Sequence, residues 1–170
     1  PLFVITGASG TGKTTVALQL PLRLPECVTL ESDILWCAPE FDTPKDGYRT
    51  HRNLWLRLAK NIGQSGRPVV LAGTALPDQF ESCPERRYLG EIHHLALVCS
   101  AKALRHRLAS RPAWRDSSSE SFVEAMLALN RWLKAHASQT KPPITLMDTT
   151  NVAPECTVRE TMAWIHQRLG

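Results

Sequence analysis

The chain has 170 residues, of which 43% are hydrophobic, and its 20 basic and 16 acidic residues give a net charge of +4. This length allows one domain with a sizeable core and is too short for two domains of ordinary size. The charges are interspersed, without the basic stripe of a nucleic-acid-binding protein, and the longest apolar runs are too short to cross a bilayer. We therefore expect one domain over residues 1–170 that acts on a small molecule, with neither nucleic acid nor a membrane as partner.

The five cysteines are odd in number, scattered along the chain and never in C-x-x-C spacing. This pattern favours neither a disulfide framework nor a zinc site. Reduced thiols are typical of the cytoplasm, so we expect a cytoplasmic protein. The sequence is compatible with a monomer or a homodimer.

The most informative segment follows an apolar run at residues 2–6, which is typical of a buried parallel strand. Residues 7–14 read GASGTGKT and fit the phosphate-binding pattern G-x-x-x-x-G-K-[ST]. Val16 and Leu20 then predict a helix that begins at Lys13. Between a strand and a helix, backbone N–H groups can surround a phosphate. The residues expected to bind the nucleotide here are Gly7, Ala8, Ser9, Gly10, Thr11, Gly12, Lys13, Thr14 and Thr15.

Two side chains of this loop have distinct expected roles. Lys13 should reach the β- and γ-phosphates of ATP, and the Thr14 hydroxyl should hold Mg²⁺. A dinucleotide-binding fold also begins with glycines, but Thr15 stands where its third glycine belongs, and a lysine occupies the helix start. The sequence therefore predicts ATP and Mg²⁺ as cofactors.

The rest of the chain alternates strands with helices. We predict strands at residues 27–30, 69–72, 92–98 and 144–147, helices from about residue 48, at 101–110, around 122–133 and around 158–169, and a loop at 74–90. This alternation predicts an α/β fold, a parallel sheet covered by helices on both faces. Ligands gather at the carboxyl ends of such strands, where the phosphate loop, Glu31, Asp33 and the Gly73-Thr74 pair all fall.

The two carboxylates after the second strand are candidates for the acceptor site. Asp33 can accept the proton of an acceptor hydroxyl, or it can hold Mg²⁺ through water, because the third strand ends in Gly73 where many ATPases have a metal-binding aspartate. A turn or capping role is the plainer alternative for Asp33. Glu31 is either a ligand of metal-bound water or a solvated residue at the edge of the site.

Four further residues are candidates for binding the acceptor. Trp36 can stack on a planar acceptor or pack in the core. Arg49 and Arg52 either bind the acceptor or are solvated, because they face away from the apolar positions predicted for their helix, Leu54, Leu58 and Ile62. Arg86 lies in the predicted loop and is equally ambiguous.

Four arginines gather around a helix break at Pro112. Arg107 and Arg111 share a helical face by their four-residue spacing, and the planar guanidinium group suits an anionic transition state. Proline and serines bracket the segment in a way typical of a mobile flap. We therefore predict a lid at about residues 105–120, with Arg111 and Arg115 as catalytic residues; a solvated basic helix is the alternative.

The phosphate loop and the carboxylate pair Glu31 and Asp33 together resemble the P-loop small-molecule kinases of the nucleoside and nucleotide kinase group. The carboxylate pair is similar to the acidic site of chloramphenicol, gluconate and adenylylsulfate kinases. The resemblance implies a P-loop NTPase fold, a three-layer α/β/α sandwich with five parallel strands in the order 2-3-1-4-5 and a helical lid.

The same resemblance implies roles for residues on the nucleotide side. The pair Arg107 and Arg111 is similar to the start of the lid in nucleotide kinases, where one arginine covers the adenine and the next contacts the transferring phosphate. The segment that contains Thr150 and Asn151 resembles the loop that holds the adenine there. Residues 111–115, RPAWR, are also similar to a stretch of bacterial ATP-binding proteins grouped with nucleoside kinases.

The sequence thus predicts an ATP-dependent kinase that phosphorylates a hydroxyl of a small polar metabolite, first a nucleoside and second an antibiotic or a sugar. One alternative is a nucleoside monophosphate kinase that holds the acceptor phosphate with Arg49, Arg52, Arg86 and Arg87. The acceptor-binding motif of that group is not evident after the third strand. The other alternative is a regulatory ATPase whose output is partner binding.

Overall fold

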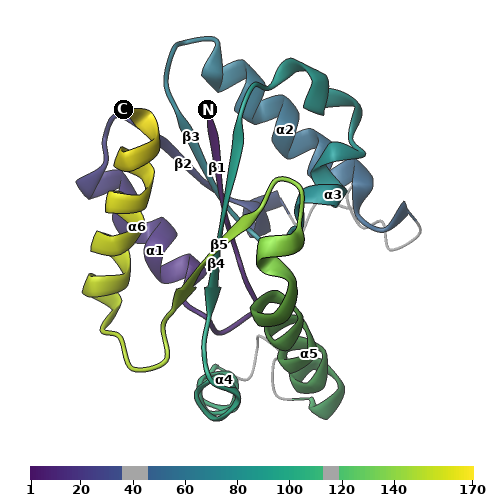
Figure 1. Cartoon of the computed structure of the whole chain (residues 1–170), viewed down its shortest axis with the longest axis vertical. Helices are drawn as coiled ribbons and strands as arrows, with labels where there is room; N and C mark the ends of the chain where they lie inside the picture. Colours follow the sequence, from purple (N-terminus) through teal and green to yellow (C-terminus); the bar gives the residue numbers. More distant parts are fainter. Residues whose placement is uncertain (36–45, 113–118) are drawn as a thin grey trace.

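A computed structural model describes residues 1–35, 46–112 and 119–170 (Figure 1). Two residues singled out by the sequence, Trp36 and Arg115, lie outside the described residues, and so does part of the predicted lid.

Five parallel strands form the central sheet: β1 (Leu2–Thr6), β2 (Val28–Glu31), β3 (Val69–Ala72), β4 (Ile92–Val98) and β5 (Ile144–Asp148). Their order is β2-β3-β1-β4-β5, which confirms the predicted P-loop arrangement. In parallel register, β1 pairs from Leu2 to Ile5 with β3 and from Leu2 to Thr6 with β4. The carboxyl ends of these strands therefore meet at one edge of the sheet, where the site is built.

Helices cover both faces of this sheet (Figure 1). One face packs against α1 (Lys13–Arg23) and α6 (Pro154–Leu169), and the other against α2 (Arg49–Gly63), α3 (Pro77–Glu81) and α5 (Glu120–His136). Successive side chains of β1 alternate between the two layers: Phe3 and Ile5 join the α1 and α6 cluster, whereas Leu2 and Val4 join the α2 and α3 cluster. The short helix α4 (Ala101–Ala109) lies beyond the carboxyl end of β4. This is the three-layer α/β/α sandwich that was predicted.

The prediction of a loop at residues 74–90 is wrong, because this segment contains α3 and the 3-10 helix η4 (Pro84–Tyr88). Two features build α3 despite its polar sequence. The Gln79 side chain accepts a hydrogen bond from the backbone N–H of Leu76, and Phe80 is buried against the α2 layer. A five-residue helix is too short to show apolar periodicity in the sequence.

The helix α2 begins where expected, but its buried face differs from the predicted one. The expected apolar face was the repeat of Leu54, Leu58 and Ile62. The fully buried residues are instead His51, Trp55, Leu56 and Ala59, while Leu58 and Ile62 are only partly buried at the border. Trp55 brings a large apolar surface to this buried face, and its indole N–H donates to Nε2 of His51 at 3.1 Å, so the polar atom of the tryptophan has a partner inside.

Across the described ranges, no helix is long and apolar enough to span a bilayer. Four of the cysteines fall in these ranges, and all four carry free thiols: Cys27, Cys83, Cys99 and Cys156.

Candidate active site

The phosphate loop joins β1 to α1 through glycines that no other residue can replace easily. Gly7 has a φ of 138°, and a Cβ there would lie 2.4 Å from the carbonyl oxygen of Leu97 in β4. Gly12, directly before α1, has a φ of 108° in the left-handed region. The loop can therefore pass close to β4 and present the N-terminus of α1 to an anion.

Lys13 is the charged group of this loop. Its Nζ donates hydrogen bonds to the carbonyl oxygens of Gly7 at 2.6 Å and Ala8 at 3.0 Å. Burial lowers the pKa of Lys13 to about 8; the carboxylates of Asp33 and Glu31 oppose this shift, and the Arg111 guanidinium adds to it. The charges of two carboxylates and one guanidinium thus all act on the Lys13 ammonium.

Thr14, the next residue of α1, contacts the end of β2. Its hydroxyl donates a 2.5 Å hydrogen bond to Oε1 of Glu31. A hydroxyl oxygen and a carboxylate beside a phosphate loop are the hard oxygen ligands that Mg²⁺ prefers. The donor set therefore fits the magnesium ion that the fold implies, and Thr14 and Glu31 are the residues that would hold it. The described residues hold no cluster of three or more histidine, cysteine, aspartate or glutamate side chains that could bind a metal without a nucleotide.

Asp33 lies on the short 3-10 helix η1 (Ser32–Leu35) that follows β2. This turn is confined from two sides. A Cβ at Gly73, at the end of β3, would lie 2.3 Å from Oγ of Ser32, so only glycine leaves room for the turn. From α2, Nε2 of the buried His51 lies 3.2 Å from the Ser32 carbonyl oxygen. Burial lowers the pKa of His51, and the Trp55 indole N–H donates to the same Nε2 at 3.1 Å.

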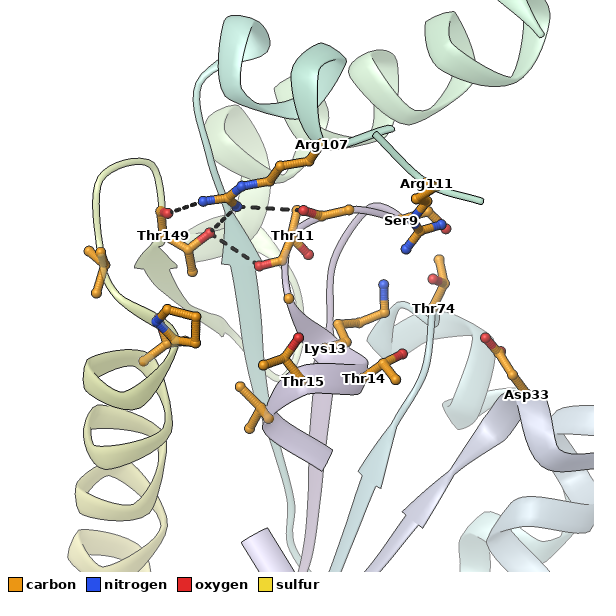
Figure 2. A pocket seen from close by; sticks show the side chains of 16 residues that line it. Ser9, Thr11, Lys13, Thr14, Thr15, Asp33, Thr74, Arg107, Arg111 and Thr149 are labelled. Carbon is orange, nitrogen blue, oxygen red and sulfur yellow. Dashed lines mark hydrogen bonds between the residues drawn. The ribbon is translucent and has the colours of Figure 1, made fainter. Parts of the chain in front are cut away.

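A cleft of about 400 Å³ opens along this edge of the sheet (Figure 2). Lys13 and Arg111 point toward one another from opposite walls, and Thr74 and Asp33 lie on the side of β3 and β2. The lining residues are Ser9, Gly10, Thr11, Gly12, Lys13, Thr14, Thr15, Val16, Asp33, Thr74, Arg107, Arg111, Thr149, Val152, Pro154 and Thr157. The structure thus brings together the predicted phosphate loop, one predicted carboxylate and two predicted arginines.

The two arginines are held differently. Arg107 of α4 donates from Nη2 to the carbonyl oxygen of Thr149 at 2.6 Å, and from Nη1 to the Thr149 hydroxyl at 3.0 Å. It reaches Gly10 and Thr150 with longer bonds to their carbonyl oxygens, at 3.5 and 3.4 Å. Arg111 lies two residues beyond the end of α4, so it does not share a helical face with Arg107 as predicted, and it extends into the cleft toward Lys13. Arg107 is therefore bound to the wall, and Arg111 is the arginine that faces the phosphate loop.

Three predicted acceptor-binding arginines do not line the cleft. Arg49 donates to the carbonyl oxygen of Ser82 at 3.1 Å, and Arg52 donates to that of Gly47. Arg86 forms an ion pair with Glu81 at 2.7 Å and donates to the Leu89 and Gly90 carbonyl oxygens. Since Gly90 precedes β4, Arg86 belongs to the edge of the sheet opposite the phosphate loop. The structure therefore does not support acceptor binding by Arg86.

The loop after β5 needs a similar correction. The Thr150 hydroxyl accepts a hydrogen bond from the backbone N–H of Ser100 at 2.9 Å and donates one to Oδ1 of Asp148, so this side chain is engaged within the loop wall. Asn151 is exposed and does not line the cleft. Their neighbours Thr149 and Val152 line it instead. The two residues predicted to hold the adenine, Thr150 and Asn151, are thus not among the cleft-lining residues of this loop.

Thr74, which was expected at this edge of the sheet, donates from its hydroxyl to the Gly7 carbonyl oxygen at 3.2 Å. Sequence reasoning missed Val152, Pro154 and Thr157, which reach the cleft from the loop after β5 and the first turn of α6. No local motif marks them, because they reach the cleft only through strand order.

The comparisons with known proteins address the family. The family described as AAA domain matches residues 2–136, which is most of the chain. The chain belongs to this AAA domain family. No curated protein sequence matches the chain.

Several solved structures share the fold of this AAA domain protein. An unliganded sugar kinase from Janibacter sp. has a TM-score of 0.72 at 18% identity, covering 97% of this chain and 94% of that one. The tunicamycin resistance protein of Deinococcus radiodurans has a TM-score of 0.70 at 20% identity, covering 97% and 95%. A gluconokinase from Sinorhizobium meliloti 1021 has a TM-score of 0.65 at 20% identity, covering 97% and 91%. The resemblance to P-loop small-molecule kinases is thereby confirmed at the level of the fold.

Proposed function

We propose that this protein is an ATP-dependent kinase that transfers the γ-phosphate to a hydroxyl group of a small polar molecule. The observation that carries the proposal is that Asp33 lines the same cleft as the phosphate loop, close enough to affect the pKa of Lys13. A phosphate acceptor is already anionic and needs cations, whereas a hydroxyl acceptor profits from a carboxylate that takes its proton. Arg49, Arg52 and Arg86 make hydrogen bonds outside the cleft, which weakens the nucleoside monophosphate alternative.

Each charged residue then has one task. The phosphate loop and Lys13 hold the β- and γ-phosphates, and Arg111 neutralises charge on the transferring group from the opposite wall. Thr14 and Glu31 would hold Mg²⁺, which supplies charge neutralisation on the phosphates when it is bound. Asp33 takes the proton of the acceptor hydroxyl. The hydroxyl oxygen then bonds to the γ-phosphorus while the bond from this phosphorus to ADP breaks and ADP leaves. The proton thus ends on Asp33 and the phosphoryl group on the acceptor oxygen.

The chemical class of the acceptor is supported by the neighbours. Three solved structures with this fold are a sugar kinase, a gluconokinase and a shikimate kinase in complex with shikimate. Sugars, gluconate and shikimate all carry several hydroxyl groups. We infer a polyhydroxylated acceptor for this chain as well. A nucleoside, whose ribose also carries hydroxyls, remains within this class, although the stacking residue Trp36 that suggested it lies outside the described residues.

A panel assay tests this proposal. The purified protein is incubated with Mg²⁺, ATP and one candidate at a time from sugars, sugar acids, nucleosides, aminoglycosides and nucleoside monophosphates, and both ADP and phosphorylated product are measured. A kinase of this kind forms ADP and product in equal amounts with at least one acceptor. ADP formed at the same rate without any acceptor would instead favour a regulatory ATPase. Product formed only with nucleoside monophosphates would overturn the hydroxyl acceptor.

A further inference from the structure

Thr149 joins three elements around the nucleotide side of the cleft. It follows β5 directly and is 3% exposed. Its backbone N–H donates to the carbonyl oxygen of Val98 at 2.8 Å, which extends the pairing with β4 by one residue. Its hydroxyl lies 3.0 Å from Nη1 of Arg107, 3.1 Å from the carbonyl oxygen of Thr11 and 3.2 Å from that of Val98 (Figure 2). One side chain thus contacts the phosphate loop, the end of β4 and α4.

These three contacts require a hydroxyl group. A threonine hydroxyl has one proton and two lone pairs. It accepts the hydrogen bond from Arg107 and shares its own proton between the two carbonyl oxygens of Thr11 and Val98. Valine has nearly the same shape but can do neither, so it would leave buried groups without partners. Serine keeps the hydroxyl and loses only a methyl group.

The contacts of Arg107 show what Thr149 positions. Both terminal nitrogens of this guanidinium face acceptors of the protein: Gly10 and the Thr149 hydroxyl at Nη1, and the Thr149 and Thr150 carbonyl oxygens at Nη2. Four N–H groups held in this way fix the plane of the guanidinium. The alternative rotamers of this long side chain, whose restriction costs conformational entropy, are thereby disfavoured before any ligand arrives.

We propose that Thr149 is a positioning residue for the nucleotide: it fixes Arg107 and the phosphate loop in one preformed arrangement through its hydroxyl. This inference rests on the proposed function, because it assumes that the cleft binds a nucleotide. Loss of the hydroxyl removes one of the four hydrogen bonds that hold Arg107, which loosens the guanidinium, and leaves the Thr11 carbonyl oxygen without this donor. Binding then has to order both, so affinity falls although Thr149 itself is no catalytic residue.

The first test compares three threonine variants by calorimetric titration with ATP and Mg²⁺. We expect Thr149→Val to raise the dissociation constant of ATP about tenfold, since a charge-assisted hydrogen bond is lost. Thr149→Ser should stay within about twofold of the parent. Thr145→Val is the matched control, because Thr145 also lies on β5 and also accepts a hydrogen bond from an arginine, Arg168, at 3.5 Å. It should leave ATP affinity unchanged.

The second test is a double-mutant cycle with Arg107→Met. If Thr149 acts mainly through Arg107, adding Thr149→Val to Arg107→Met raises the dissociation constant less than about twofold further. A full second tenfold loss would overturn the inference, as would an equal loss in Thr149→Ser or in Thr145→Val. A parent protein that binds no ATP would overturn the proposed function, and this inference with it. If the parent binds ATP but the effects of the two substitutions are additive, only this inference is overturned and the proposed function stands.

Discussion

The nucleotide side and the acceptor side of the cleft are built in different ways. On the nucleotide side, backbone groups of the phosphate loop, α4 and the loop after β5 are joined by hydrogen bonds through Lys13, Arg107 and Thr149. On the acceptor side, Asp33 is exposed at the tip of a short 3-10 helix and accepts a 3.3 Å hydrogen bond from the Ser32 hydroxyl. Phosphates are the same in every nucleotide, so backbone geometry can recognise them. An acceptor is specific to one enzyme, and its site depends on single side chains from separate segments.

The largest expected effect tests the nucleotide side. Lys13→Ala should remove phosphoryl transfer while the fold stays intact, because it deletes the cation at the phosphates and nothing from the core. Steady-state rates measure the loss of phosphoryl transfer, and thermal unfolding shows whether the fold is intact. Lys102→Ala, which removes an exposed lysine of α4, is the control and should behave like the parent. Activity of Lys13→Ala within a few-fold of the parent would contradict the phosphate-loop assignment.

The next effect tests the acceptor side. Asp33→Asn keeps the shape of the side chain but removes the basic oxygen, and general-base catalysis of this kind contributes roughly 10²- to 10⁴-fold. We expect kcat to fall by that factor with nearly unchanged ATP affinity. Asp78→Asn, at an exposed aspartate of α3, is the matched control.

The magnesium dependence of the Asp33→Asn variant separates two roles. A variant that lacks only the base saturates at the Mg²⁺ concentration of the parent, whereas a damaged metal site needs more. Full activity of Asp33→Asn would remove the main argument for a hydroxyl acceptor and favour the nucleoside monophosphate alternative.

A smaller effect tests how Asp33 is positioned. In Gly73→Ala, the new Cβ would lie 2.3 Å from Oγ and 2.7 Å from Cβ of Ser32, so the turn that carries Asp33 must move. A displacement of about 1 Å can cost roughly 10²-fold in rate, and we expect a ten- to hundredfold loss in kcat without loss of ATP binding. Adding Ser32→Gly removes both clashing atoms and should restore most of the rate. Gly63→Ala, where no atom lies within 4 Å of the new Cβ, is the control. Failure of the Ser32→Gly rescue would count against this account of Gly73.

The smallest effect is a pH dependence of ATP binding. Burial lowers the pKa of Lys13 to about 8 in the free protein, while bound phosphates favour the charged form. Below pH 8 the ammonium is already protonated and affinity should be flat. Above pH 8 binding must take up a proton, so the dissociation constant should rise by up to about tenfold per pH unit. Titrations between pH 7 and 10 measure this, and Lys13→Arg, charged throughout, should show no such rise if it binds ATP. A flat profile for the parent would contradict the pKa of Lys13.

The sequence predicted the sheet and the position of the phosphate loop because both depend on local signals. The apolar runs of β1 and β4 and the spacing from Gly7 to Thr14 are each contained in a few consecutive residues. The contacts of Thr149 were not predicted, because they join residues as many as 138 positions apart, which no local pattern reveals. Arg86 was proposed for the acceptor site because its charge is visible in the sequence. The ion pair of Arg86 with Glu81 could not be foreseen, because the helix that carries Glu81 is too short to predict.

The most direct test of a hydroxyl acceptor is the chemical form of the transferred phosphorus, measured by phosphorus NMR on the product of the reaction with Mg²⁺ and ATP. Transfer to a hydroxyl predicts one new phosphate monoester signal, split by the hydrogens on the adjacent carbon and growing in step with ADP. A new signal coupled to a second phosphorus, as in a phosphoanhydride, would contradict the proposal and assign the protein to the nucleoside monophosphate kinases.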